Sequence, residues 1–217
     1  NCPDCVAQFE GQNQVFLGAN ATEPYTLLCT SVLDGLASFK GKKFRSGAAN
    51  FGRWAESVGG IKVQMPGNEI YDAMSQGVVD CAMLSASTLI EQSLSEVTKQ
   101  IIFGVPGGVF SGLADNNVNK DYWQSLSPDM RAVLMRGTSL LSAAIVMAQA
   151  DIVERGMKAG EESGLLVTQA DEETMAAYSD FVNGDVAVIS QQFEEKFGLN
   201  NVGTKIETFK DLLAKWK

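Results

Sequence analysis

The chain has 217 residues, of which 45% are hydrophobic and 20% charged, a composition typical of a globular protein with one large or two small domains. Its net charge of −9 argues against nucleic acid or an anionic membrane surface as a partner. Since the chain contains no histidine, it lacks the usual general base and the commonest zinc ligand, which disfavours hydrolytic and zinc enzymes. No uninterrupted run of about 20 apolar residues indicates a transmembrane helix.

The chain opens on a Cys-x-x-Cys pair, Cys2-Pro-Asp-Cys5. A thioredoxin-like redox motif lies where a strand runs into a helix of a βαβ unit, whereas the polar stretch QFEGQNQ follows here. A zinc knuckle needs a second such pair, but Cys29 and Cys81 stand alone. The pair is therefore interpreted as structural. The alternative function is that of a thiol-disulfide oxidoreductase, which would use Cys2 and Cys5.

The segment from residue 42 to residue 84 alternates between strand and helix periods. KKFRS reads as a strand, and a helix follows with Phe51, Trp54, Ala55 and Val58 on one apolar face. IKVQM is a second strand, a Pro-Gly-Asn turn leads into the helix EIYDAMSQ, and VVDCAML is an apolar strand of the buried, parallel type. Strand, helix, strand, helix, strand makes a βαβαβ unit, so the predicted fold class is α/β.

The second half of the chain is predicted to be mainly helical. A helix over 89–99 precedes two strands within 101–115, which flank a Pro-Gly-Gly turn. Ser127 caps a helix that begins at Pro128 and continues to about Ser163, roughly 50 Å at about 1.5 Å per residue, long enough to bridge two small domains. The strand LLVTQ and helices over 171–183, 185–197 and 205–216 complete the chain.

The elements of this pattern stand in a recognisable order: Lys-Gly before a strand ending on Arg45, Trp54 and SVGG closing a helix, VQMPGNEIYDAMSQGVVD, and Trp-x-x-Leu-Ser-Pro opening the long helix. In this order and spacing, the chain from about residue 14 to its end resembles the substrate-binding receptors of tripartite ATP-independent periplasmic (TRAP) transporters, the dicarboxylate-receptor type. In that family two α/β domains, bridged by a long helix, close on a ligand. Its members are longer, so the resemblance implies that much of the N-terminal domain is missing from this chain.

The resemblance implies a periplasmic-binding-protein-like organisation. We expect 1–25 to be a hinge or crossover remnant, 26–106 the α/β ligand-binding domain, 107–126 strands and a helix of the other domain, 127–163 the bridging helix, and 164–217 a C-terminal strand and helices. The implied function is that of a periplasmic, non-enzymatic receptor with no cofactor and no metal. It would capture a small organic carboxylate and deliver it to the membrane components of a TRAP transporter.

Arg45 is the strongest candidate ligand contact. It ends a predicted parallel strand, where open α/β sheets bind ligands, and a guanidinium takes a carboxylate bidentately. In the resembling family the arginine at this strand end grips the ligand carboxylate. Less specific candidates for the pocket wall are Tyr25, where some relatives carry a second arginine, and Asn68, Met83, Ser85 and Phe110. A turn or core role is at least as plausible for Asn68 and Phe110.

Two further expectations concern cysteine pairing and the ligand. We expect a disulfide between Cys29 and Cys81, both inside the matching region and each next to a predicted strand. Cys2 would pair with Cys5, or either of them with a cysteine outside this chain. Because the residues at the expected site offer one arginine beside Tyr25, Met83 and Leu84, a ligand with one carboxylate and an apolar or hydroxylated body is expected to bind better than a diacid.

Overall fold

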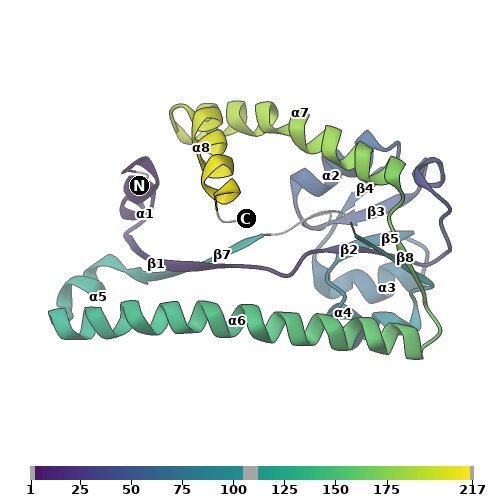
Figure 1. Cartoon of the computed structure of the whole chain (residues 1–217), viewed down its shortest axis with the longest axis horizontal. Helices are drawn as coiled ribbons and strands as arrows, with labels where there is room; N and C mark the ends of the chain where they lie inside the picture. The colour runs from purple at the N-terminus through teal and green to yellow at the C-terminus, as the bar shows by residue number, and fades with distance from the viewer. Residues whose placement is uncertain (1–2, 105–111, 216–217) are drawn as a thin grey trace.

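The computed structural model describes residues 3–104 and 112–215, which form two β-sheets of unequal size. Strands β1 (Gln14–Ala21) and β7 (Leu113–Asn119) pair as an antiparallel ribbon. Six strands form the larger sheet, in the order β4-β3-β5-β2-β6-β8. The ribbon and the larger sheet lie toward opposite ends of the molecule, and one long helix runs along both (Figure 1). The predicted α/β class is confirmed.

The predicted βαβαβ unit is present. Strand β3 (Lys43–Ser46) leads through helix α2 (Ala49–Ser57) to β4 (Ile61–Gln64), and helix α3 (Ile70–Ser75) leads on to β5 (Cys81–Leu84). Both β4 and β5 pair with β3 in parallel, one on each side of it. The chain thus leaves β3 in one direction and returns on its other side, which creates a topological switch point at the carboxyl end of β3. Open α/β sheets bind their ligands at such a point.

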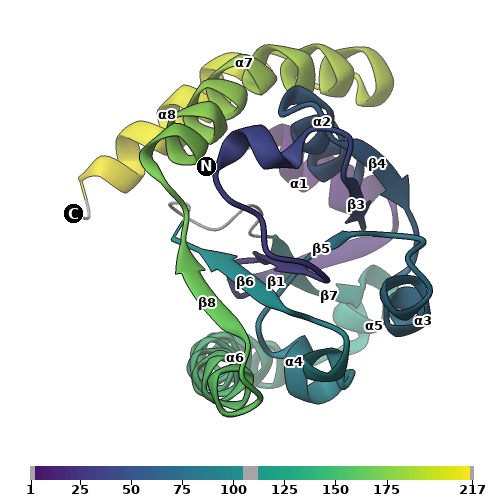
Figure 2. The same ribbon diagram turned by 90° about the vertical axis from the view of Figure 1, so that its right-hand side faces the viewer.

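Helices cover both faces of the larger sheet, which explains why its central strands are apolar on both sides. Figure 2 shows α2 and α7 on one face and α3, α4 and α6 on the other. On the first face Phe44 packs with Trp54 of α2, whose side chain is 1% exposed. On the second face Ile70 of α3 packs with Ala82 and Leu84 of β5. Trp54 is therefore a core residue, as its helical spacing predicted.

A disulfide joins two strands in the middle of the larger sheet. Strand β2 (Thr26–Cys29) is antiparallel to both β5 and β6 (Gln100–Phe103), and β8 (Leu166–Gln169) extends the sheet beyond β6. Cys29 lies directly opposite Cys81, with their Cα atoms 4.1 Å apart, and the two form the expected disulfide. In the chain-entropy model, a closed loop of this size stabilises a fold by about 4 kcal/mol.

The long helix α6 (Pro128–Glu162) joins the two sheets, and its expected start is confirmed, since the Ser127 hydroxyl accepts from the backbone N–H of Met130 at 3.3 Å. It packs closely at small residues. A Cβ at Gly18 of β1 would lie 2.8 Å from the Thr138 methyl group, and a Cβ at Gly156 would overlap the carbonyl of Ala86. One half of α6 is therefore fitted to the ribbon and the other half to the larger sheet.

Helix α7 (Glu172–Phe197) is one continuous helix, where the sequence predicted two that meet at Gly184. Its first half packs Tyr178 and Phe181 onto the core beside Trp54. Gly184 weakens a helix by only about 1 kcal/mol relative to alanine, so these tertiary contacts outweigh it. The helix predicted over 205–216 is α8 (Val202–Ala214).

The helix predicted over 89–99 is interrupted. It consists of α4 (Thr88–Glu91) and a 3-10 turn, η3 (Leu94–Glu96), because Ser93 between them adopts a left-handed conformation with φ 54°. The shorter elements are helices α1 (Pro3–Gly11) and α5 (Lys120–Ser125) and the 3-10 turns η1 (Leu36–Phe39) and η2 (Gly67–Glu69).

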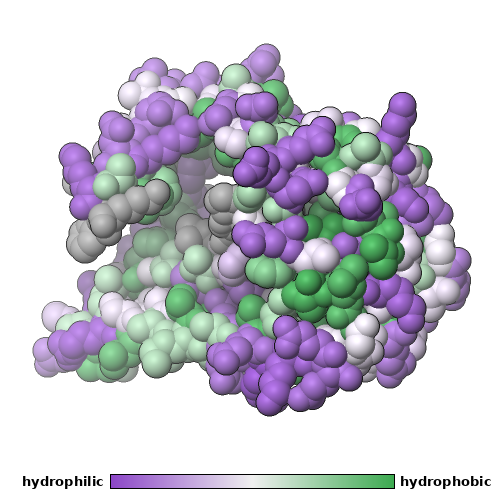
Figure 3. Space-filling view, turned by 45° about the vertical axis from the view of Figure 1, so that its right-hand side comes forward, coloured by the Kyte–Doolittle hydropathy of each residue, from purple (hydrophilic) through white to green (hydrophobic). Residues whose placement is uncertain are grey.

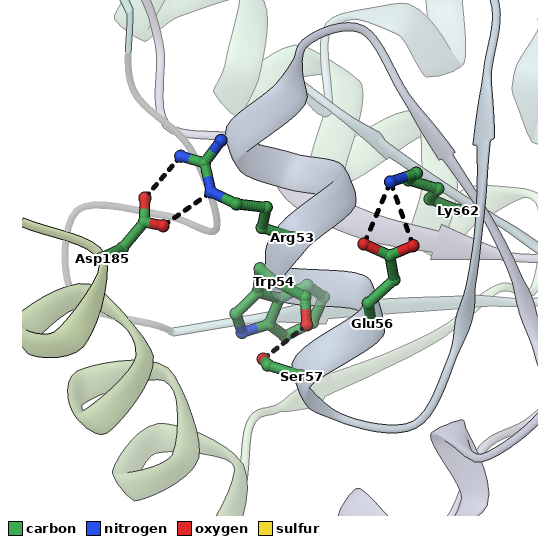
Figure 4. Close-up of polar contacts among 6 residues, drawn as sticks. All are labelled: Arg53, Trp54, Glu56, Ser57, Lys62 and Asp185. Atoms are coloured by element: carbon green, nitrogen blue, oxygen red, sulfur yellow. Dashed lines mark hydrogen bonds and ion pairs between the residues drawn. The ribbon is translucent and has the colours of Figure 1, made fainter. Parts of the chain in front are cut away.

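An ion pair clamps α7 onto α2 (Figure 4). Arg53 of α2 donates from Nε and Nη2 to the two carboxylate oxygens of Asp185, at 2.6 and 2.7 Å. Asp185 is 7% exposed, and its hydrogen bond raises the pKa of Arg53 above the ordinary value. A second pair in the same view, Lys62 with Glu56, is about half exposed on both sides and therefore contributes little.

Apolar side chains remain exposed along α6 and on the distal parts of α7 and α8. In the space-filling view the molecule is hollowed between these helices, with hydrophobic surface around the hollow (Figure 3). Leu140 and Met147 of α6 and Phe209 of α8 are all more than 60% exposed. By length and composition alone α6 could cross a membrane, although polar residues interrupt its apolar sequence. The helix contacts Gly18 and Ala86 closely, although only 6% of its most apolar stretch is buried within the described residues.

Replacing Gly156 with alanine should destabilise the chain, because the new methyl group would overlap the backbone of Ala86, which cannot turn away as a side chain would. Overpacking of this kind costs about 1–3 kcal/mol or more. The matched control is Gly137→Ala in the same helix, where no atom lies within 4 Å of the new methyl group. It should stabilise the helix by about 0.5–1 kcal/mol. Urea unfolding of both variants measures the difference, and equal effects would show that α6 does not pack on Ala86.

Removing the guanidinium with Arg53→Ala should lower the free energy of unfolding by about 3 kcal/mol, because it leaves the buried Asp185 carboxylate without a partner. The matched control, Glu56→Gln, breaks an exposed pair on the same helix and should change it by less than about 1 kcal/mol. Denaturant unfolding checks both values. If Arg53→Ala is as mild as Glu56→Gln, the clamp does not stabilise α7 on α2.

Candidate functional site

Arg45 occupies the switch point of the larger sheet. It pairs with Val63 of β4 on one side and with Ala82 of β5 on the other, one residue before β3 ends. Tyr25 precedes β2, which runs antiparallel to β5, so it reaches the same edge of the sheet. The fold therefore brings Tyr25 and Arg45, both predicted to be site residues, to the same edge of the sheet.

Backbone carbonyls fix the guanidinium of Arg45. Its Nε donates to the carbonyl of Met65, after β4, at 3.1 Å, and its Nη1 donates to the carbonyl of Met83, in β5, at the longer distance of 3.5 Å. Arg45 is only 6% exposed. The neighbouring strands thus orient this side chain, a role for Met65 that no side-chain pattern in the sequence could indicate.

The charge of Arg45 is not balanced by a carboxylate within the described parts of the chain, residues 3–104 and 112–215, since its contacts there are the two carbonyls. Burial lowers the pKa of Arg45 from its ordinary value, and the nearby Tyr25 partly offsets that shift. An arginine nevertheless stays protonated at neutral pH. A buried guanidinium without a counter-charge is energetically unfavourable and attracts an anion.

Two glycines leave room for the guanidinium. A Cβ at Gly47 would lie 3.1 Å from Nη2 and 3.2 Å from Nη1, closer than ordinary contacts allow, and a Cβ at Gly67 would lie 3.5 Å from Nη2. Gly47 follows β3 and Gly67 follows β4. Small residues after both strands therefore let the backbone lie against Arg45.

Tyr25 supplies a neutral phenol beside this cation. Its ring stacks edge-on against Phe51 of α2, with ring centroids 5.8 Å apart. Desolvation, followed by the charge of Glu23, raises the pKa of Tyr25, while Arg45 acts in the opposite direction. The hydroxyl therefore remains protonated near neutral pH and can donate a hydrogen bond.

The other residues singled out from the sequence lie in different environments. Met83 has no exposed surface and packs in the core, so it contributes its carbonyl to Arg45. The Ser85 hydroxyl accepts from the backbone N–H of Ser87 at 3.1 Å and thus forms the turn after β5. Asn68 is exposed within η2, next to Gly67. Phe110 lies outside the described residues.

The N-terminal cysteine motif does not lie in the context of a redox motif. Cys5 is in α1, which leads into the ribbon strand β1 and not into the parallel unit, and it is disulfide-bonded. Cys2 lies outside the described residues. Within residues 3–104 and 112–215 no group of three or more acidic or cysteine side chains could hold a metal ion.

A separate cavity of about 170 Å³ lies between β8 and the start of α7 and does not include Arg45. A buried polar side chain in its wall, Gln100, accepts from the N–H of Leu33 and donates to the Leu33 carbonyl and the Thr168 hydroxyl. Because these polar groups already bond to one another, we regard this cavity as structural and place the candidate site at Arg45.

Comparison with known proteins connects this geometry to a family. A model of the bacterial extracellular solute-binding protein family 7 matches residues 10–192. A curated solute-binding protein of Albidiferax ferrireducens is 31% identical over 116 residues, which make up 53% of this chain and 34% of that protein. The chain thus spans about a third of that relative.

Two solved TRAP periplasmic solute-binding proteins share the fold. One, from Rhodoferax ferrireducens with bound malonate, superposes with a TM-score of 0.71 at 21% identity, over 83% of this chain and 57% of that one. The other, from Bordetella bronchiseptica with bound (R)- and (S)-mandelate, has a TM-score of 0.71 at 25% identity, over 81% of this chain and 56% of that one. Since the family model covers most of its length, the chain belongs to the bacterial extracellular solute-binding protein family 7.

Proposed function

We propose that this chain carries the carboxylate-binding part of an extracytoplasmic receptor, which captures a small organic acid and delivers it to the membrane components of a TRAP transporter. The observation that carries the proposal is the buried guanidinium of Arg45 without a carboxylate partner in the described residues. A ligand carboxylate would supply the missing counter-charge through short, charge-assisted hydrogen bonds. Binding without turnover also fits a family of solute-binding proteins.

The segments have different roles in this proposal. Residues 26–106 form the ligand-binding domain, because they hold Arg45 and the strands that orient it. Residues 1–25 and 107–126 supply the hinge and the ribbon, 127–163 the bridging helix, and 164–217 the strand and helices that pack back onto the sheet. We place the receptor in the periplasm, as in the TRAP proteins that share the fold.

The proposed ligand carries a single carboxylate. Arg45 is the only buried cation within residues 3–104 and 112–215, since Arg53 is partly exposed and already paired with Asp185. A second ligand carboxylate at this site would lose its hydration without gaining a partner. Tyr25 and Phe51 offer an aromatic surface suited to an apolar or hydroxylated body. Mandelate, bound by one of the similar proteins, has this chemistry; malonate, bound by the other, does not.

Replacing Arg45 with glutamine in the receptor should weaken binding of its organic acid by roughly 10- to 150-fold, the equivalent of losing about 1.5–3 kcal/mol of charge-assisted hydrogen bonding. Isothermal titration calorimetry measures the change. The matched control is Arg155→Gln on α6, where the arginine side chain is 63% exposed, and affinity should not change. Unaltered binding by a correctly folded Arg45→Gln variant would refute the role of Arg45.

A thermal-shift panel of acids should rank monocarboxylates above diacids, because at equal concentration a tighter-binding ligand stabilises the native state more. We expect mandelate, lactate and pyroglutamate to raise the melting temperature more than succinate or malonate at equal concentration. The same panel on Arg45→Gln controls for non-specific ion effects. If a diacid gives the largest shift in the receptor but not in this variant, the ligand carries two carboxylates and the single-anchor proposal is wrong.

A further inference from the structure

Helix α2, directly after Arg45, begins without a capping side chain. Its N-cap residue is Ala48, extended at φ −150° and ψ 164°, and no side chain accepts a hydrogen bond there. The first backbone bond of the helix runs from the N–H of Gly52 to the carbonyl of Ala48. The backbone N–H groups of Ala49 and Asn50 therefore have no acceptor among the described residues, and the first turn contains no acidic side chain.

Some other helices of this chain are capped by their own side chains, whereas α3, α4 and α8, like α2, have no side-chain hydrogen bond at the N-cap residue. The caps of α5, α6 and α7 are Asn119, Ser127 and Asp171. The start of α2 thus keeps both its unsatisfied donors and the partial positive charge of a helix N-terminus.

The guanidinium nitrogen of Arg45 that has no described acceptor, Nη2, lies close to the start of α2. With Nε and Nη1 bonded to Met65 and Met83, Nη2 donates to no described atom. The guanidinium lies against Gly47, two residues before the first helical residue, since a Cβ there would be 3.1 Å from Nη2. A guanidinium that is 94% buried therefore keeps a free donor, Nη2, beside the glycine that leads into the uncapped start of α2.

We propose that the ligand carboxylate bridges Nη2 of Arg45 and the free backbone N–H groups of Ala49 and Asn50, so that the start of α2 is the second half of the anion site. The inference rests on the proposed function and specifies how the carboxylate is held. One carboxylate oxygen accepts a hydrogen bond from the guanidinium, and the other accepts from the backbone N–H groups at the start of α2. The helix dipole and the unsatisfied donors both favour a negative charge at that helix start. This arrangement holds the carboxylate firmly without a second arginine.

The variant Ala49→Pro tests the proposal by deleting one backbone donor. Ala49 is the first helical residue, a position where proline is favoured, and Ala48 already has the extended conformation that proline requires of the residue before it. The fold should therefore tolerate the change, while the affinity for (R)-mandelate and for lactate should fall about tenfold. The matched control is Glu172→Pro, the first residue of α7, whose cap Asp171 is also extended; it should leave both affinities unchanged.

Amide NMR gives a readout that does not depend on the variant. In wild-type protein, the N–H signals of Ala49 and Asn50 should shift saturably during titration with (R)-mandelate, by more than the amides at the start of α7. If Ala49→Pro does not fold, this titration decides the question. Shifts at the site that leave the Ala49 and Asn50 signals in place would overturn the proposal.

Arg45→Gln separates this inference from the proposed function. Loss of binding in Arg45→Gln with wild-type affinity in Ala49→Pro would overturn the helix contact and leave the role of Arg45 intact. Wild-type affinity in both variants would overturn both. If neither (R)-mandelate nor lactate produces a saturable shift of any amide in wild-type protein, the proposed acid class fails, and the helix contact fails with it.

Discussion

The burial of Arg45 as a cation without a carboxylate partner is the constraint on which the rest of the site depends. The Arg53–Asp185 clamp on the next helix is a partly buried ion pair, in which each charge is balanced by the other. Arg45 is instead held by two carbonyls, which orient it but carry no net charge. In the proposed function, a ligand anion would supply the negative charge that the described residues do not place beside Arg45.

The scaffold explains how such a group is kept in place. The strand order β4-β3-β5 brings carbonyls from both neighbours of β3 to the guanidinium, and the Cys29–Cys81 disulfide ties β5 to the strand beyond it. Helix α2 starts where β3 ends, and the clamp to Asp185 holds it under α7. The cation therefore sits on regular elements whose positions are fixed independently of any ligand, as a pre-organised binding group should.

Much of this could be predicted from the sequence because it follows from local pattern. The alternation of apolar residues from Phe44 to Leu84 indicated the parallel unit, and Ser127 with Pro128 indicated the start of α6. The position of Arg45 followed from the same pattern. Two predicted helix boundaries were wrong. Helix α7 continues through Gly184 because its side chains pack beside α2, and α4 ends because the backbone of Ser93 adopts a left-handed conformation. The carbonyl contacts of Arg45 could not be predicted from the sequence, because any residue at positions 65 and 83 has a backbone carbonyl.

The most direct measurement is a crystal structure of the receptor saturated with a monocarboxylate such as (R)-mandelate. We expect a carboxylate oxygen about 2.7–2.9 Å from Nη2 of Arg45, with the carbonyl contacts of Met65 and Met83 retained. A fully occupied ligand whose carboxylate binds elsewhere, while Arg45 keeps only its backbone partners, would contradict it.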